Sequence, residues 1–162
     1  MLRYLFRQPR NLFSYEHARF AEIGGVNAGM ILSYGGNEKA AEDLRTGWLF
    51  IVQMKLKFLM KLPTLLKFNR AVGGLDRHEA YISNVATFPH YRGSGIGTAL
   101  VRAAEEAAQA NGAVTMVLDV EQDNKKAIEL YKRLGYRVTG KSCVPLGKGV
   151  EVVSYRMAKS LV

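Results

Sequence analysis

A glycine-rich loop between a strand and a helix is the feature that most constrains this chain. The loop runs from Tyr91 to Thr98. The stretch Glu79 to Thr87 before it predicts a strand, and Pro89 keeps the chain extended there. The alanine-rich stretch Thr98 to Asn111 predicts a helix that Gly112 ends. Glycines let the backbone approach a ligand, and a helix N-terminus offers unpaired N–H groups, so the loop suits a phosphate or pyrophosphate.

The glycine spacing excludes two common phosphate-binding patterns. The nucleotide triphosphatase loop requires a Lys directly after its last glycine, and no Lys follows these glycines. The dinucleotide fingerprint requires G-x-G-x-x-G, whereas this loop reads G-x-G-x-G. The pattern that fits is Gln or Arg, two residues, Gly, one residue, then Gly or Ala, read as Arg92, Gly95 and Gly97.

The remaining pattern predicts an α/β (α+β) layered domain with a mixed sheet. Strands are expected at Ala18 to Ile23 and Ala28 to Tyr34, with a turn at Gly24 to Asn27 and Gly35 to Asn37 closing the hairpin. Further on we expect a buried strand, a capped helix and a strand pair: Ala113 to Val120, a helix capped by Asp123 or Asn124 and ended by Gly135, then Tyr136 to Gly140 and Val150 to Met157. Repeats and flexible linkers are absent from the sequence, which favours one domain over residues 1–162.

The net charge of +9 is concentrated in a basic, apolar stretch. The sequence has no acid between Asp43 and Asp76. The longest unbroken apolar run there, Trp48 to Val52, is far short of the ~20 residues that span a bilayer, so we expect no transmembrane segment. The pattern predicts a basic helical insertion at about residues 45–70: an amphipathic helix ending near Pro63 and a short helix to about Asn69.

The N-terminal residues admit two interpretations. Met1 to Tyr15 carries Arg3, Arg7 and Arg10 and no acid, as a transit peptide does, but its apolar spacing also suits an ordinary amphipathic helix. We expect the ordinary helix and a cytoplasmic protein. The single cysteine, Cys143, fits a reducing compartment and excludes an internal disulfide framework.

Three segments together resemble the GNAT superfamily of N-acetyltransferases. They are the loop pattern preceded by Asn84 to Arg92, the stretch Asn124 to Tyr131, and Leu134-Gly135-Tyr136. The resemblance covers roughly Phe20 to Lys159 and is most similar to the branch that contains the ribosomal-protein N-terminal acetyltransferases. It implies a mixed, mostly antiparallel central sheet flanked by helices. The short stretch before the first hairpin leaves little room for the family's first strand, so we expect that strand to be missing and a partner subunit, as in a homodimer, to complete the cleft.

The resemblance implies acetyl-CoA as co-substrate and direct transfer to an amine, without an acyl-enzyme. In this family the fourth strand splays from the fifth, and backbone groups there bind the thioester and pantetheine. Carried over to this chain, the expected acetyl-CoA residues are Val85, Ala86 and Thr87 for the thioester, Arg92, Gly93, Ser94, Gly95, Ile96, Gly97 and Thr98 for the pyrophosphate, and Asn124 for the pantetheine arm.

The resemblance also implies the catalytic residues. Tyr131 matches the tyrosine that protonates the departing thiolate, although its helical spacing equally suits a core position. Asp119 lies where similar acetyltransferases carry a catalytic Glu and is one candidate general base. Glu79 is the alternative base, because it shares a strand face with Tyr81 and Ser83. For both carboxylates the alternative interpretation is a solvated side chain at the end of a strand, without a catalytic role.

Other functions are weighed against the enzyme. His17, His78 and His90 are isolated in sequence and Cys143 belongs to no motif, so we expect no metal site. A degenerate module that binds acyl-CoA without turnover is the alternative function. The basic stretch could contact nucleic acid or a membrane, but a packed helix or a subunit interface is preferred for it. The acceptor is a small-molecule or peptide amine that the sequence does not identify.

Overall fold

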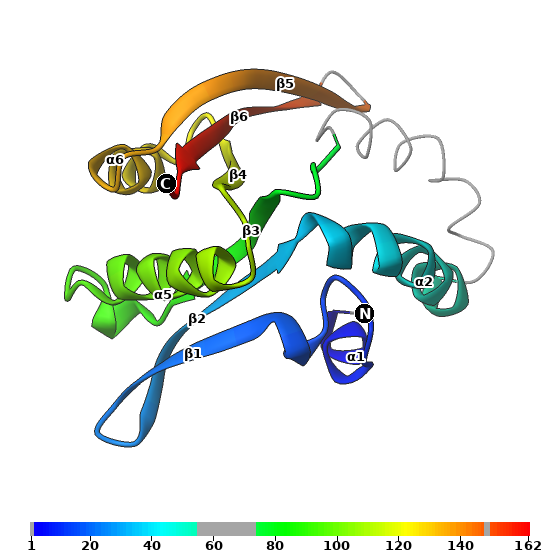
Figure 1. The fold of residues 1–162 in the computed structure, drawn as a ribbon, viewed down its shortest axis with the longest axis horizontal. Coiled ribbons are helices and arrows are strands. Elements are labelled where there is room, and N and C mark those ends of the chain that lie inside the picture. The colour runs from blue at the N-terminus through cyan, green and yellow to red at the C-terminus, as the bar shows by residue number, and fades with distance from the viewer. Residues whose placement is uncertain (1, 55–73, 148–149) are drawn as a thin grey trace.

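The structure is a computed structural model that describes residues 2–54, 74–147 and 150–162. Its elements in chain order are α1 (Leu2–Arg7), η1 (Tyr15–His17), β1 (Ala18–Ile23), β2 (Val26–Gly35), α2 (Gly36–Met54), β3 (Glu79–Thr87), η2 (Pro89–Tyr91), α5 (Ile96–Ala110), β4 (Thr115–Glu121), α6 (Lys125–Arg133), β5 (Arg137–Gly147) and β6 (Val150–Ser160). Figure 1 shows them as one twisted sheet with helices on both sides.

The sheet has six strands in the order β1-β2-β3-β4-β6-β5. Only β3 and β4 are parallel, so the expected mixed, mostly antiparallel sheet flanked by helices is confirmed. In the described residues before β1 there are only α1 and η1, and β1 is an edge strand of the described sheet.

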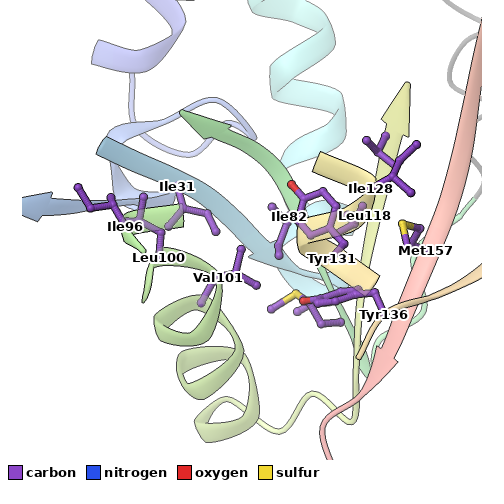
Figure 2. Close-up of a cluster of buried hydrophobic side chains, with 14 of the residues drawn as sticks. Ile31, Ile82, Ile96, Leu100, Val101, Leu118, Ile128, Tyr131, Tyr136 and Met157 are labelled. Atoms are coloured by element: carbon purple, nitrogen blue, oxygen red, sulfur yellow. The ribbon is translucent and has the colours of Figure 1, made fainter. Parts of the chain in front are cut away.

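The helices α5 and α6 cover one face of the sheet (Figure 2). On α5, Leu100, Val101 and Ala104 recur at helical spacing and are almost fully buried. They pack with Ile82 and Leu118 from the central strands. Burial of each large aliphatic side chain contributes about 1.5–3 kcal/mol, so this cluster fixes α5, and the loop before it, against the end of β3.

The N-terminal segment and α2 cover the other face. Leu12, Leu32 and Tyr34 form a second buried cluster there. The backbone N–H of Leu12 donates a hydrogen bond to Thr46 Oγ1 of α2 at 3.0 Å. This contact joins residues far apart in sequence and ties α2 to the segment before β1.

Several expected boundaries are wrong. The N-terminal helix ends at Arg7 and is followed by irregular chain, not by helix to Tyr15. Gly35 to Asn37 do not close a hairpin: Glu38 accepts a hydrogen bond from the Gly35 N–H at 2.7 Å, and α2 starts at Gly36, well before residue 45. Of the helical insertion expected at about residues 45–70, residues 45–54 belong to α2, and the remainder, with the helix ends near Pro63 and Asn69, lies outside the described residues.

The turns and the last hairpin also differ from expectation. The first hairpin has a two-residue turn, Gly24 and Gly25. Their φ angles of 58° and 79° lie in the left-handed region that favours glycine, and β2 therefore starts at Val26. The strand expected at Tyr136 to Gly140 continues to Gly147, because β6 offers it pairing partners along nearly its whole length.

Candidate functional site

The site is built where β3 and β4 separate. Their register runs only from Glu79 opposite Thr115 to Ile82 opposite Leu118, although β3 continues to Thr87 and β4 to Glu121. The cause lies in β3, where the pairing to β2 skips Ser83 and leaves it as a β-bulge. A bulge bends its strand and re-aims the residues that follow. The end of β3 therefore leaves β4 and opens a wedge between the two strands.

Val85, Ala86 and Thr87 line one side of this wedge. They pair with β2 through Ile31, Met30 and Gly29 but have no partner in the β4 register. Backbone N–H and C=O groups are strong hydrogen-bonding groups that need partners, so this strand edge can pair with an extended ligand. The structure thus brings these three predicted residues to a place where they could hold a pantetheine arm.

The glycine loop follows directly and leads into α5. Gly93 and Gly95 have φ angles of 83° and 84°, a left-handed region that favours glycine. Gly95 is the N-cap of α5 and supplies no side chain to satisfy the first N–H groups of that helix. Arg92, Gly93, Ser94 and Gly95 are all exposed. The loop therefore presents backbone donors to solvent at the positive end of a helix, which suits a pyrophosphate.

The other N-terminus near the wedge belongs to α6. Asn124 caps it, and its side-chain carbonyl accepts a hydrogen bond from the Ala127 N–H at 3.2 Å. The predicted role of Asn124 as a ligand of the pantetheine arm would therefore fall to its amide NH₂ group, since the carbonyl is used in the cap.

Tyr131 lies on α6 and is 8% exposed. Its ring belongs to the same buried cluster as Ile82 and Leu118, the last paired residues of β3 and β4 (Figure 2). It also contacts Tyr136 edge to face, with ring centroids 5.7 Å apart. Burial raises the pKa of the Tyr131 phenol, so its proton is retained at neutral pH. The core role and the role of a proton donor at the wedge are therefore compatible.

Asp119 follows Leu118 on β4, at the first position beyond the paired segment. Its Oδ2 accepts a hydrogen bond of 3.0 Å from the Tyr81 hydroxyl and lies 4.0 Å from Nη1 of Arg156. Burial raises the pKa of Asp119, while the Arg156 charge and the Tyr81 hydrogen bond act in the opposite direction. Asp119 is a half-buried carboxylate beside the wedge, and a raised pKa there suits a general base.

Aromatic contacts connect Tyr81, the partner of Asp119, to residues further across the sheet. The ring of Tyr81 lies 5.6 Å from Tyr34, which lies 5.8 Å from His17. His17 Nε2 in turn is 2.8 Å from a carboxylate oxygen of Glu42 on α2. Burial raises the pKa of both Tyr34 and Tyr81, so both phenols stay protonated. The chain of contacts links the wedge to α2.

Glu79, the second candidate base, lies apart from Asp119 and Tyr81. Glu79 lies at the start of β3, and its Oε2 accepts a hydrogen bond of 2.9 Å from the Asp76 N–H. Its side chain therefore closes the turn that leads into the strand, and three residues of paired strand lie between it and the bulge.

Sequence reasoning missed Arg156 and the partnership of Tyr81 with Asp119. Arg156 lies opposite Asp119 in the β4–β6 register, a pairing between segments nearly 40 residues apart that no local pattern reveals. Tyr81 was noted only as a neighbour of Glu79 on one strand face. Within the described ranges, no three His, Cys, Asp or Glu side chains are grouped as a metal site would need.

Comparison with known proteins gives one family. The model of the acetyltransferase (GNAT) family matches residues 3–136. An uncharacterized N-acetyltransferase of Methanocaldococcus jannaschii is 47% identical over 66 residues, which are 40% of this chain and 29% of that protein. N-alpha-acetyltransferase 30 of Schizosaccharomyces pombe is 41% identical over 56 residues, 35% of this chain and 37% of that protein. The chain therefore spans less than two thirds of the length of these curated relatives.

Solved structures show the same fold. A ribosomal-protein alanine N-acetyltransferase of Escherichia coli has a TM-score of 0.59 at 17% identity, over 98% of this chain and 74% of that one. An acetyltransferase from Salmonella typhimurium, solved with its cofactor acetyl-CoA, has a TM-score of 0.59 at 19% identity, over 90% of this chain and 64% of that one.

Proposed function

The chain belongs to the GNAT acetyltransferase family, and from this premise we propose that it transfers an acetyl group directly from acetyl-CoA to a primary amine. The observation that carries the proposal is the wedge between β3 and β4, which has Tyr131 in the cluster beneath it and Asp119 at its edge. The glycine loop follows the same strand, which supports a donor site next to the two groups that we propose for proton transfer.

Acetyl-CoA would be bound by the predicted residues of three separate segments. The loop from Arg92 to Thr98 would bind the pyrophosphate with its backbone N–H groups. Asn124 and the free strand edge of Val85 to Thr87 would bind the pantetheine arm. An N–H of that edge would polarise the thioester carbonyl as an oxyanion donor. The exposed glycines, which carry no side chain over the loop, support this fit.

We assign the two proton transfers to the half-buried Asp119 and the buried Tyr131. An amine arrives protonated and must lose a proton before its nitrogen lone pair can attack the thioester carbon. Asp119 would accept that proton, directly or through water. When the C–S bond breaks, the sulfur carries the electron pair, and the Tyr131 hydroxyl would give it a proton. The second proton, which leaves the acylated nitrogen, would pass through water to the Tyr131 phenolate. Since burial raises the pKa of Tyr131, the phenol holds that proton until the thiolate forms.

The acceptor and the setting of the reaction are part of this proposal. The acceptor would be a small-molecule or peptide amine, reached from the side of the sheet where Tyr81 and Asp119 lie. The single exposed cysteine, Cys143, supports a reducing, cytoplasmic compartment. Among the strands that the structure describes, β1 is an edge strand, which supports completion of the sheet by a second copy in a homodimer.

The test is acetyl-CoA consumption with a panel of amines and peptides. Tyr131→Phe is expected to lower kcat about 100-fold, because a general acid contributes at least that much, while binding of CoA is retained. Tyr136→Phe is the matched control: it is buried in the same cluster, but its hydroxyl lies near Glu105. If CoA stabilises the fold and no amine is acetylated, the chain is a degenerate acyl-CoA-binding module.

A further inference from the structure

A hollow of about 300 Å³ lies at the end of the sheet where β3 leads into the glycine loop. Its walls come from β1, β2 and the end of β3, and its apolar side chains are those of Phe20, Met30, Ala86 and Phe88. We call this hollow the end pocket. None of the residues that line it carries a charge. Its lining therefore suits an uncharged, apolar group.

The side chains of the end pocket lie on the same side of the sheet as the candidate base. Phe20 is opposite Met30 in the strand register, and Met30 is opposite Ala86, so the three side chains share one face. Met30 packs against the second buried cluster, and so does Tyr81. Tyr81 is the residue that donates a hydrogen bond to Asp119. The end pocket is thus on the side from which the proposed acceptor reaches the wedge.

The described residues leave an exposed path between the wedge and the end pocket. Asn84 and Ala86 are exposed on β3, and the rings of Phe20 and Phe88 are 51% and 52% exposed. Figure 1 shows α1 and α2 at the end of the β1–β2 hairpin that is far from its turn. Exposed apolar surface of this kind marks a binding site.

The end pocket is also continuous with the proposed donor site. Ala86 and Thr87 line the pocket and belong to the strand edge that we propose for acetyl-CoA. The wedge starts at the bulge at Ser83, three residues before Ala86. With a rise of about 3.3 Å per residue, the pocket begins about 10 Å from the start of the wedge. A molecule whose amine reaches the thioester therefore spans the distance to the pocket with a short chain.

We propose that the end pocket is an acceptor subsite, which binds an apolar side chain or ring at about 10 Å from the reacting amine. The proposal rests on the proposed function and names the chemistry of its acceptor. The pocket is at the lower end of the volumes of small-molecule sites, about 300–1,000 Å³, so it suits a single side chain or ring. A hollow of this size does not fit a flat lipid layer. In the part of the chain that the structure describes, no helix is long and apolar enough to cross a membrane.

The test compares acceptors that differ only in the apolar group. In an extended peptide the third residue lies up to about 10 Å from the terminal amine. Pentapeptides of alanine are compared with the same peptides carrying Phe or Asp at the third position, or Phe at the second. We expect Phe at the third position to lower KM about tenfold with little change in kcat, because remote binding stabilises ground state and transition state equally. Asp there should raise KM, and Phe at the second position should have a smaller effect.

A second pair of acceptors identifies the source of the apolar group. Hexylamine and 6-phenylhexylamine differ by a ring at about the same distance from the amine. A ring that lowers KM only in the peptides indicates a peptide acceptor, and one that lowers it only in the alkylamines indicates a small molecule. Either result supports the subsite.

Variants of Phe20 connect this preference to the end pocket. Phe20→Asp places a charge in the apolar lining, and we expect it to reduce the preference for Phe over Ala at the third position from about tenfold to less than twofold. Phe20→Ala should reduce it in part. Ile23→Asp is the matched control, since Ile23 is 46% exposed on the same strand but does not line the pocket. It should keep the wild-type preference. All variants must keep the wild-type circular dichroism spectrum.

Three results would overturn the proposal. They are a KM that does not depend on the apolar group of any acceptor, a preference that Phe20→Asp leaves intact, and a Phe20→Asp variant whose altered constant is the KM for acetyl-CoA alone. Turnover of hexylamine or of the alanine peptide without an apolar preference would overturn the subsite and leave the proposed function in place. If no amine at all is acetylated, the proposed function itself fails.

Discussion

The hydroxyl of Tyr81 donates a hydrogen bond of 3.0 Å to Oδ2 of Asp119 across the point where β3 and β4 separate. The bond joins the two strands just where their backbone pairing ends. It also stabilises the ionised form of a carboxylate whose pKa burial raises. The same contact therefore joins the two strands at the base of the wedge and favours the ionised form of the candidate base, against the larger effect of burial on its pKa.

Tyr81→Phe should move the acidic limb of the pH–rate profile to higher pH. Loss of the hydrogen bond removes one of the two influences that lower the pKa of Asp119, so the pKa rises and more base is protonated at a given pH. The limb of log kcat against pH, measured with one amine, checks this. A Tyr34→Phe control, which leaves the hydrogen bond to Asp119 intact, should shift the limb less. An unmoved limb in Tyr81→Phe would show that Asp119 is not the titrating base.

The activities of Asp119→Asn and Glu79→Gln should distinguish between the two candidate bases. Because Asp119 lies at the wedge and Glu79 closes a turn, kcat is expected to fall about 100-fold in Asp119→Asn and to stay within a few-fold in Glu79→Gln. Steady-state kinetics with saturating acetyl-CoA measures both. A large loss in Glu79→Gln with an active Asp119→Asn would reverse the assignment.

The difference in stability between the wild type and Asp119→Asn should depend on pH. The folded-state pKa of Asp119 lies above its unfolded value, so its favourable contribution is complete below the unfolded pKa and is lost as pH rises through the folded pKa. The Tm of wild type minus that of Asp119→Asn should therefore decrease from acid to neutral pH. Thermal unfolding at several pH values tests it, and the opposite trend would contradict the raised pKa.

Gly95→Ala should weaken binding of acetyl-CoA, whereas Gly97→Ala should not. Gly95 has a φ of 84°, where an L side chain costs about 1–2 kcal/mol, so the loop must rearrange. At Gly97 an added Cβ would lie 3.5 Å from Leu130 Cδ2, an ordinary contact, and alanine favours the helix. Calorimetric titration and Tm should both rank the variants this way. Equal losses of acetyl-CoA affinity in the two variants would mean that the backbone conformation at Gly95 does not determine binding.

Glu105→Leu should destabilise the fold, and Lys159→Met should restore much of the loss. Lys159 Nζ lies 2.6 Å from Glu105 Oε2, and Glu105 is 8% exposed, so removal of the acid leaves a partly buried ammonium. We expect the free energy of unfolding to fall by about 2–4 kcal/mol in Glu105→Leu and by less in the double variant, since an apolar pair avoids the desolvation cost. Urea unfolding of both singles and the double completes the cycle. Additive losses would show that the pair does not interact.

Several elements could be predicted from sequence because short-range interactions decide them. The bounds of β1 and β3 are those expected, Ala18–Ile23 and Glu79–Thr87, since the strand-forming residues and the turn residues that flank them are neighbours in sequence. Asp123 or Asn124 was expected to cap α6, and Asn124 is the cap. The start of α2 was missed, because it depends on how Glu38 binds the Gly35 N–H and on the contact of Thr46 with Leu12.

The sequence alone determined the family, the fold class and the loop suited to a pyrophosphate, because these reside in contiguous residues whose backbone preferences are local. The tertiary structure decided which carboxylate lies at the wedge. Asp119 meets Tyr81 and Arg156 there, while Glu79 is used in a turn. It also decided that α2 buries one apolar face and leaves another exposed. Strand register and helix orientation are set by pairing and packing between distant segments, and no periodicity within one segment encodes them.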